Sequence, residues 1–264
     1  MTWNPSQYLQ YAGERMRPAL DLLARIAVDA PPTVVDLGCG AGNVTRVLAE
    51  RWPRATLVGV DNDAAMLARA RLALGTDPRV RFVEADIAAW LPERPVDVVY
   101  SNAALHWADD HRMLFPRLLG AVVHGGFLAV QMPANFGAPS HRALFATASS
   151  PRWRGRLAAL IRPEPVAPAD RYYEWLAPHA ESLDLWTTEY LQVLPARADG
   201  EHPVVAWTRG TALVPFVAAL DEADRPAFVA DFAARIADAY VPRADGAVLF
   251  PFRRLFVVAR RAVR

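Results

Sequence analysis

The sequence contains no lysine, so all 29 of its lysine-or-arginine residues are arginine. This absence excludes enzymes that form a Schiff base on lysine, and it excludes P-loops, whose motif requires one. Cys39 is the only cysteine among 264 residues. A single cysteine excludes disulfide bonds within the chain and argues against cysteine-based metal sites, so we expect no bound metal.

Long hydrophobic runs and a strong charge bias are also missing. No apolar run approaches the ~20 residues that span a bilayer, and the start lacks a signal-peptide pattern, so we expect a cytoplasmic protein. The net charge is only +1 and the arginines are dispersed, which argues against a nucleic-acid partner. With 53% hydrophobic and 22% charged residues, the chain is typical of a globular protein with a sizeable core.

The most informative stretch is residues 34–43, Val-Val-Asp-Leu-Gly-Cys-Gly-Ala-Gly-Asn. An apolar run leads to an acidic residue, glycines follow at alternate positions, and apolar residues then recur at helical spacing. This pattern predicts a buried strand, a tight loop and a helix start, which in α/β sheets bind nucleotide-like ligands. The third glycine, Gly42, comes one residue too early for a dinucleotide loop. We therefore disfavour the alternative of an NAD-binding oxidoreductase.

Acidic residues end the next two predicted strands. Asp61 follows the apolar run 57–60, where a carboxylate can accept hydrogen bonds from ribose hydroxyls. Asp86 ends the run 80–86, where a carboxylate can accept from an adenine amino group. The alternative is that both are helix N-caps or turn residues, as many aspartates are. The combination with the glycine loop favours a nucleoside site.

Strand and helix patterns alternate between residues 32 and 133 and predict an α/β fold, a mostly parallel sheet with helices on both faces. The predicted strands lie near 33–37, 56–60, 80–83, 96–101 and 126–131, and the predicted helices at 42–51, 63–74 and 111–123.

The flanking segments complete a single predicted domain. Residues 1–31 are predicted to form an N-terminal helical cap. In this cap we expect a short helix that begins after Ser6 and a second helix that starts near Pro18. Two insertions, about 134–180 and 200–242, lack the alternation and are predicted to be helical and to form a lid. Strands at 184–194 and 247–261 are predicted to form a final antiparallel pair, which brings the sheet to seven strands.

The glycine loop and the two acids resemble those of class I S-adenosylmethionine-dependent methyltransferases, which have a Rossmann-like fold. The resemblance implies that residues 36–42 hold the methionine end of the cofactor, that Asp61 holds the ribose and that Asp86 reads adenine. It also places residues 102–107 beside the sulfonium. The cofactor-binding residues so implied are Arg15, Asp36, Gly38, Cys39, Gly40, Gly42, Asp61, Asn62, Met66, Asp86, Ile87, Asn102 and Ala103.

Several further segments resemble trans-aconitate methyltransferases nearly from end to end. The more specific ones are Trp-Asn-Pro-Ser at 3–6, Gln-Met-Pro at 131–133 and Arg-Leu-Phe at 254–256. The resemblance implies methylation of one carboxylate of trans-aconitate, giving a monomethyl ester and S-adenosylhomocysteine. The residues expected around the reacting groups are Trp3, Tyr8, Asn102, Trp107, Gln131 and Arg254.

A carboxylate acceptor is already ionised at neutral pH, because its pKa is near ~4, so this reaction needs no general base. A tricarboxylate does need cationic partners, which arginine supplies best. The candidates are Arg15, Arg209, Arg253 and Arg254, with surface or salt-bridge roles as the alternative. Arg15 is also a candidate for the carboxylate of the cofactor.

One departure from the family leaves the acid open. Val214 stands where the family is expected to have arginine, and Arg253 where it is expected to have proline. The alternatives are therefore another polycarboxylic acid, or another small-molecule oxygen, nitrogen or carbon acceptor. Amine or phenol acceptors would give His106 or Tyr8 a role as base. A catalytically inactive binding scaffold is the remaining alternative. We expect a monomer with a small-molecule substrate.

Overall fold

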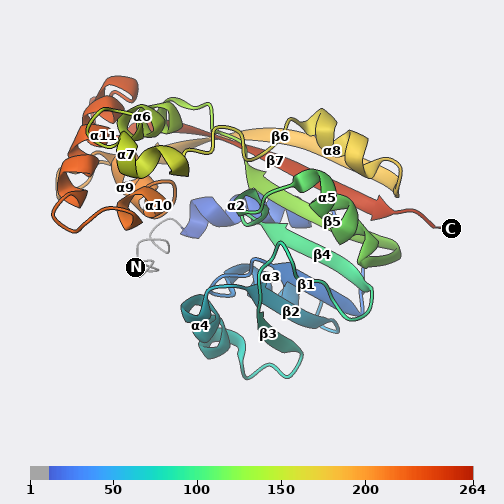
Figure 1. Ribbon diagram of the computed structural model, residues 1–264. Helices are drawn as coiled ribbons and strands as arrows, with labels where there is room; N and C mark the ends of the chain where they lie inside the picture. The colour runs from blue at the N-terminus through green and yellow to red at the C-terminus, as the bar shows by residue number, and fades with distance from the viewer. Residues whose placement is uncertain (1–11, 264) are drawn as a thin grey trace. The chain divides into compact units, whose positions relative to one another are not determined.

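The computed structural model describes residues 12–263, with side chains from residue 16 onward. The chain forms two compact units, each of which we describe separately (Figure 1). Of the described residues, the sheet unit comprises 15–134, 165–188 and 254–263, and the helical unit comprises 12–14, 135–164 and 189–253.

The seven-stranded sheet has the order β3-β2-β1-β4-β5-β7-β6. Its strands are β1 (Thr33–Leu37), β2 (Thr56–Asp61), β3 (Val80–Glu84), β4 (Val96–Asn102), β5 (Val122–Pro133), β6 (Ala180–Leu194) and β7 (Val248–Arg261). Strand β1 pairs in parallel with both β2 and β4, whereas β7 runs antiparallel to β5. From β1 the chain adds strands outward to β3, and it then crosses to the other side of β1 to add β4 and β5. The strand order therefore reverses between β1 and β4, which is where α/β sheets bind ligands.

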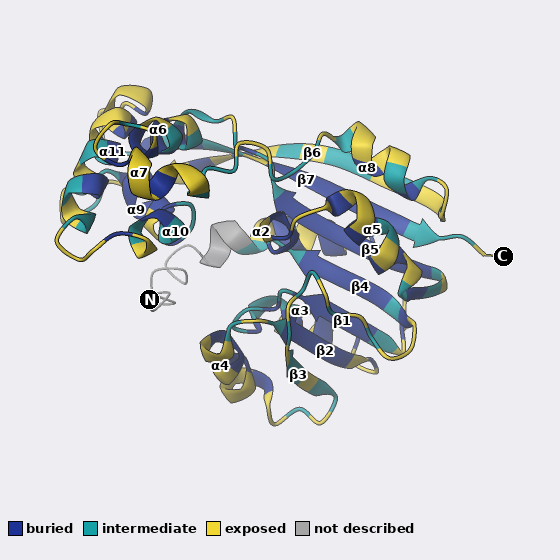
Figure 2. Ribbon diagram, viewed as in Figure 1, coloured by how far each residue is buried: buried dark blue, intermediate teal, exposed yellow. Residues whose placement is uncertain are grey.

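Helices α2 (Ala12–Leu23), α3 (Asn43–Arg51), α4 (Ala64–Leu74), α5 (His111–Gly120) and α8 (Ala169–Leu176) accompany this sheet, with a 3₁₀ turn η1 at Leu105–Trp107. The residues of the central strands are mostly buried, as Figure 2 shows. Burial on both faces of a sheet requires apolar side chains at successive positions, which is why the sequence of these strands is nearly continuously apolar. Long-range hydrogen bonds fix the helices. The hydroxyl of Tyr100 donates to the carbonyl of Ala19 at 2.7 Å, and the His111 ring lies 2.6 Å from the hydroxyl of Tyr172.

The helical unit contains α6 (Pro139–Ala148), α7 (Arg154–Leu157), η2 (Ala158–Leu160), α9 (Pro203–Arg209), α10 (Val214–Ala218) and α11 (Arg225–Ala239). It has a separate apolar core that includes Trp153, Trp207, Phe228 and Phe250. The Trp153 and Phe228 rings pack edge to face with centroids 5.6 Å apart, and the indole N–H of Trp153 donates to Asp231 at 2.7 Å. Aromatic packing thus supplies this unit with a core of its own, to which the first part of β7 contributes Phe250.

The predicted seven-stranded α/β sheet is confirmed, and most of its elements lie within one or two residues of the predicted positions. Five elements differ. Helix α2 begins at Ala12 and continues through Pro18 instead of starting there, and residues 203–241 form three helices instead of two. Helix α5 ends at Gly120, three residues early, while β5 begins at Val122 and β6 at Ala180, each four residues early. The first predicted insertion is divided, because residues 165–180 cluster with the sheet unit. The placement of the insertions as a lid stays a prediction.

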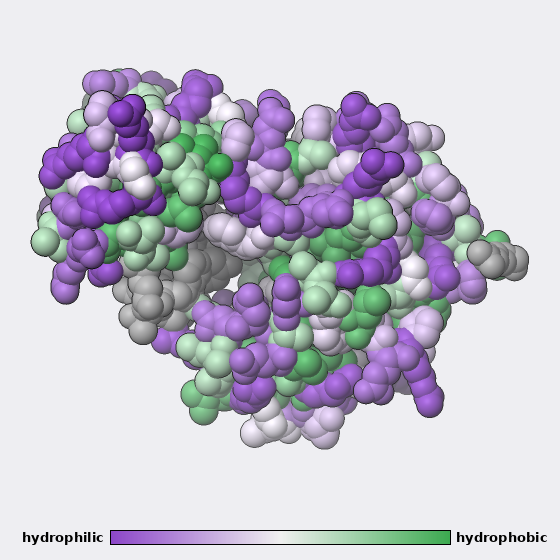
Figure 3. Space-filling model, viewed as in Figure 1, coloured by the Kyte–Doolittle hydropathy of each residue, from purple (hydrophilic) through white to green (hydrophobic). Residues whose placement is uncertain are grey.

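No helix within the described residues is long and apolar enough to cross a membrane. The face of the molecule in Figure 3 interleaves hydrophilic and hydrophobic side chains.

Candidate active site

The glycine loop joins β1 to α3 and requires glycine at its first position. Gly38 has φ +82°, and a Cβ built there would lie 2.1 Å from the Cβ of Ala104. The N–H groups of Gly38 and Cys39 both donate to the carbonyl of Val60, at 2.7 and 3.0 Å. The loop is therefore held between β2 and the segment that follows β4. A Cβ on Gly40, by contrast, would meet no atom within 4 Å, so the loop has open space at that position.

Asp61, at the end of β2, is held in place by two backbone donors. Its Oδ2 accepts from the N–H of Gly40 at 2.8 Å, and its Oδ1 accepts from the N–H of Asp63 at 2.9 Å. A carboxylate has about four acceptor positions, so both oxygens keep capacity for a ligand. The N-cap of α4 is Asp63, which accepts from the N–H groups of Ala65 and Met66. Asp61 is thus not the helix N-cap, although its bond from Asp63, two residues on, is that of a local turn.

Asp36 points into the interior instead of toward solvent. Its side chain is 2% exposed, and its Oδ2 accepts from the hydroxyl of Thr45 at 2.6 Å. Burial raises the pKa of Asp36 to about 7, the Thr45 hydrogen bond lowers it, and the nearby Asp61 raises it further. Burial also raises the pKa of the Cys39 thiol, with the charges of Asp36 and Asp61 adding to the effect. Asp36 therefore fixes the loop to α3 through Thr45.

The remaining residues named for the nucleoside part lie around the ends of β2 and β3. Asp86 is exposed, and its Oδ1 accepts from the N–H of Ala88 at 2.8 Å. Asn62 is exposed, Ile87 is half-buried, and Met66 is 9% exposed. Asp86 is thus in a local turn, and its second oxygen accepts no bond from a described residue.

The segment after β4 has an unusual backbone. Ala103 has φ +54°, and its N–H donates to the carbonyl of Gln131 at 2.9 Å. A positive φ is unfavourable for residues with a Cβ, so surrounding bonds must impose it. The Oδ1 of Asn102 is buried and accepts no hydrogen bond from a described residue. Trp107 is 53% exposed, and its ring centroid lies 4.7 Å from that of the buried His106.

Gln131 and Arg254 form a buried pair at the junction of β5 and β7. Gln131 is fully buried and Arg254 is 4% exposed. The Nη1 of Arg254 donates to the Oε1 of Gln131 at 3.1 Å, while the Nε2 of Gln131 has no acceptor among the described residues. Gln131 is in register with Asn102 on the parallel neighbour β4. An arginine, two amides and the strained Ala103 are therefore gathered at one place in the sheet unit.

The remaining predicted site residues are ion-paired, exposed or outside the described part of the chain. Arg209, in the helical unit, is ion-paired with Glu201 through its Nε, at 2.5 Å. Arg253 is exposed. Trp3, Tyr8 and the side chain of Arg15 lie outside the described residues.

Sequence reasoning missed several positions that shape this site. Thr45 holds Asp36, and Ala104 fills the space that only glycine leaves at position 38. Asp63 caps α4, and this role was visible in the sequence because an aspartate directly precedes a helical pattern. The pairing of Thr45 and Ala104 with the loop had no signal in the sequence, since it depends on tertiary structure.

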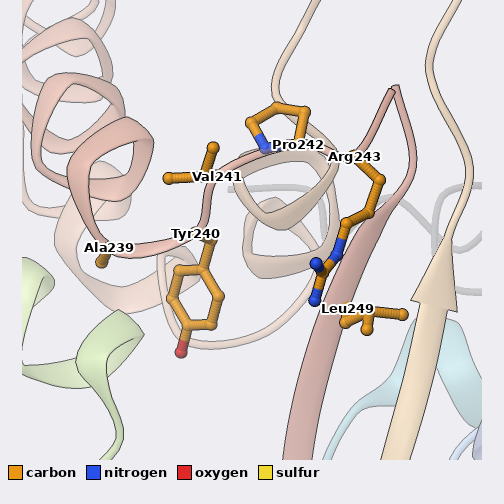
Figure 4. Close-up of a pocket in the computed structure, with 6 residues that line it drawn as sticks. All are labelled: Ala239, Tyr240, Val241, Pro242, Arg243 and Leu249. Atoms are coloured by element: carbon orange, nitrogen blue, oxygen red, sulfur yellow. The ribbon is translucent and has the colours of Figure 1, made fainter. Parts of the chain in front are cut away.

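A cavity of about 310 Å³ lies in the helical unit and contains none of the predicted site residues. It is lined by Ala239, Tyr240, Val241, Pro242, Arg243 and Leu249. In Figure 4 the side chain of Arg243 extends toward Leu249. Among the residues that the structure describes, no cluster of histidine, cysteine, aspartate and glutamate could hold a metal ion.

Comparisons with known proteins agree on one kind of protein. A family model described as a methyltransferase domain matches residues 34–126. The chain is 49% identical over 260 residues to a trans-aconitate 2-methyltransferase of Azoarcus sp., covering 98% of this chain and 99% of that one. It is 45% identical to a trans-aconitate 2-methyltransferase of Methylobacterium nodulans, with 98% of each chain covered.

A solved structure supports the fold. Phosphoethanolamine N-methyltransferase 2 of Haemonchus contortus, in complex with S-adenosyl-L-methionine, superposes with a TM-score of 0.56 at 17% identity. The match covers 94% of this chain and 53% of that one, so the present chain spans about half the length of that enzyme. At this identity the likeness concerns the fold alone.

Proposed function

The chain belongs to the family of trans-aconitate 2-methyltransferases, which use S-adenosylmethionine, and from this premise we infer that it is an enzyme that methylates one carboxylate of trans-aconitate. The products are a monomethyl ester and S-adenosylhomocysteine. The structural observation that carries the proposal is the buried Arg254, which donates to Gln131 on the neighbouring strand. A guanidinium at such a place is suited to bind a carboxylate.

The glycine loop and Asp61 fit S-adenosylmethionine. The open space at Gly40 leaves room for a ligand against the backbone, and the two backbone bonds to Asp61 fix the orientation of its carboxylate. In the proposal, Asp61 accepts hydrogen bonds from the ribose hydroxyls, and the buried Oδ1 of Asn102 accepts from the amino group of the methionine part. When bound, the cofactor supplies an electrophilic methyl group.

In the proposal, Arg254 and Gln131 orient the acid. The guanidinium donates to a carboxylate of the substrate, and the Nε2 of Gln131 supplies a further donor. Two fixed donors hold the nucleophilic oxygen at a defined position, which is the main requirement of an in-line displacement. We propose that Trp107, which is exposed, excludes water from the reacting groups once substrate is bound.

No proton needs to move in this reaction. The carboxylate of the acid is ionised at neutral pH, because its pKa is near ~4. The bound cofactor would supply the methyl group and keep the electron pair of its carbon–sulfur bond, while Arg254 and Gln131 would hold the attacking oxygen. His106 and Tyr8 are therefore not required as general bases. The value of kcat/KM should accordingly not rise with pH between pH 6 and 8, as it would if a base had to lose its proton.

Two positions of this chain differ from the family in residues expected to bind the acid. Val214, half-buried at the start of α10, stands where the family is expected to have an arginine. Arg253, which is exposed, is the residue that we propose as its substitute. We also propose that the enzyme acts as a monomer in the cytoplasm and has no nucleic-acid partner.

The experiment that tests this function is methyl transfer from labelled S-adenosylmethionine to a panel of small acids. The panel contains trans-aconitate, cis-aconitate, citrate, isocitrate and several fatty and aromatic acids. We expect trans-aconitate to give the highest kcat/KM. No transfer to any tricarboxylate, by protein that still binds S-adenosylhomocysteine, would contradict the substrate and retain the cofactor.

A further inference from the structure

The first residue of α5, His111, is a buried histidine with a hydrogen-bond partner at each ring nitrogen. It is 6% exposed. Its Nε2 lies 2.9 Å from the carbonyl oxygen of Leu105, and its Nδ1 lies 2.6 Å from the hydroxyl of Tyr172 in α8. A carbonyl oxygen can only accept, so the ring proton is assigned to Nε2. The ring therefore connects α8 to the turn η1, and both of these elements belong with α5 to the sheet unit.

Tyr172 is itself fixed by packing and by a backbone donor. It is fully buried, and its ring packs edge to face against those of Phe115 and Trp175, with centroids 4.7 and 5.1 Å away. Its hydroxyl accepts from the N–H of Ala167 at 3.3 Å. Burial raises the pKa of this hydroxyl, so it keeps its proton and can donate it to Nδ1 of His111. The hydrogen bond from Tyr172 thus holds the imidazole in one orientation.

The segment that His111 contacts has an unfavourable backbone at both ends. Ala103, before η1, has φ +54°, and Asp110, after it, has φ +50°. Residues with a Cβ adopt such values only where surrounding contacts impose them. The N–H of Ala103 donates to the carbonyl of Gln131, and the side chain of Asp110 accepts from the N–H of Met113 at 3.3 Å. Both ends are therefore anchored, and the turn between them needs restraints of its own.

The carbonyl of Leu105 is the point at which this turn is tied to α5. It accepts from the N–H of Ala108 at 3.0 Å as well as from Nε2 of His111. The N–H of Trp107 donates to the carbonyl of Ala104, also at 3.0 Å. A 3₁₀ turn is a short element with poor hydrogen-bond geometry, so these local bonds hold it only weakly. The bond from His111 supplies a tertiary restraint that orients the turn.

We propose that His111, oriented by Tyr172, is a positioning residue for the methyl transfer. The inference rests on the proposed function, in which Asn102 and Trp107 border the reacting groups. His111 acts through the backbone of Leu105. It determines where residues 102–107 lie at the carboxyl end of β4, and it thereby determines the positions of the two side chains.

The acid is bound by residues outside this segment. Gln131 and Arg254, which orient the acid in the proposed function, lie on β5 and β7. A displaced segment should therefore lower kcat more than it raises the KM for the acid. The Kd of S-adenosylhomocysteine should rise as well, because Asn102 is proposed to bind the methionine part of the cofactor. A general loss of stability would not produce this combination.

Substitutions at His111 can separate the two ring nitrogens. The amide nitrogen of glutamine lies near the position of Nε2 and can donate to the carbonyl of Leu105, whereas asparagine is too short to reach it. Tyr172→Phe removes the hydroxyl that orients the ring. Thr33→Val is the matched control, because it removes a side-chain hydrogen bond of the same unit at the amino end of β1. There the Thr33 hydroxyl donates to Asp97 at 2.6 Å.

The experiment measures kcat and KM for trans-aconitate, the Kd of S-adenosylhomocysteine and the melting temperature, with all assays well below that temperature. His111→Asn should lower kcat by about tenfold or more, keep the KM within about threefold, and raise the Kd by about fivefold or more. His111→Gln should stay within about threefold of the parent in all three constants. Tyr172→Phe should lower kcat by about threefold or more. Thr33→Val should lower only the melting temperature.

Parental constants in His111→Asn would overturn the inference. Equal losses of kcat in the glutamine and asparagine variants would also overturn it, as would losses in every variant, Thr33→Val included, that follow the melting temperature. Both results indicate a merely structural role. If His111→Asn does not fold, Tyr172→Phe decides, and a smaller loss of kcat than expected overturns the inference.

Failure of the proposed function gives a different result. If the parent methylates none of the acids in the panel, the inference is tested on the cofactor alone. S-adenosylhomocysteine should then bind about fivefold more weakly to His111→Asn, and within about threefold of the parent to His111→Gln. Equal affinities of these two variants would overturn the positioning role.

Discussion

The backbone N–H of Gly40 donates to Oδ2 of Asp61 at 2.8 Å, and this bond joins the glycine loop to the end of the neighbouring strand. The two motifs that the sequence suggests separately are therefore one structural unit. A change in either one should be felt by the other.

Asp61→Asn should weaken S-adenosylhomocysteine binding by about 10- to 100-fold, because an amide has one acceptor oxygen where the carboxylate has two. The N–H groups of Gly40 and Asp63 would then compete with the ligand for that single oxygen. Isothermal titration calorimetry measures this. Asp63→Asn is the control, since asparagine caps helices as well as aspartate does, and it should bind as the parent does. Equal affinity in both variants would contradict the role of Asp61.

Gly38→Ala should destabilise the protein by about 3 kcal/mol or more, because a Cβ would clash with Ala104 in a left-handed backbone conformation. Gly40→Ala also has a positive φ, yet its Cβ would meet open space, so we expect a loss of only about 1 kcal/mol. Urea unfolding of both variants provides the comparison. Similar losses would show that backbone strain, and not the contact with Ala104, requires the glycine.

The stability of the protein should depend on pH through Asp36. Its pKa is about 7 in the folded state, against an ordinary value of 3.8, so the folded state binds the proton more tightly. The stabilisation from this group is complete below about pH 4 and is lost as the pH rises through 7. Relative to Asp36→Asn, the parent should therefore lose up to about 4 kcal/mol between pH 4 and 7. Urea midpoints at several pH values measure the difference, and parallel curves for the two proteins would refute it.

Arg254→Ala should lower kcat/KM for trans-aconitate by about 100-fold or more, because a buried guanidinium–carboxylate bond would be lost. Arg254→Lys should recover only part of it, since lysine lacks the planar fork. The Kd of S-adenosylhomocysteine should stay within twofold in both. Arg209→Ala is the control, because Arg209 is ion-paired with Glu201. Full activity of Arg254→Ala would remove this residue from the site.

Local patterns were sufficient for much of the sheet and its glycine loop, and insufficient where distant residues decide the structure. Residues 33–37 are recognisable as a strand in the sequence because they form a short apolar run, and the structure buries that run on both faces of the sheet. Pro18, by contrast, suggested a helix start, but it is buried inside α2, where packing outweighs the missing N–H. The bond between Gln131 and Arg254 joins residues 123 positions apart, and no local pattern reports it.

The single cysteine lies within the glycine loop, 7% exposed, with a pKa that burial raises above its ordinary value. A thiol in this state reacts with alkylating reagents only when the loop opens, since the thiolate is the reactive form. The labelling rate of Cys39 therefore reports how often this loop departs from its closed conformation. Because the chain has no other thiol, that rate can be read from the whole protein without engineering a probe.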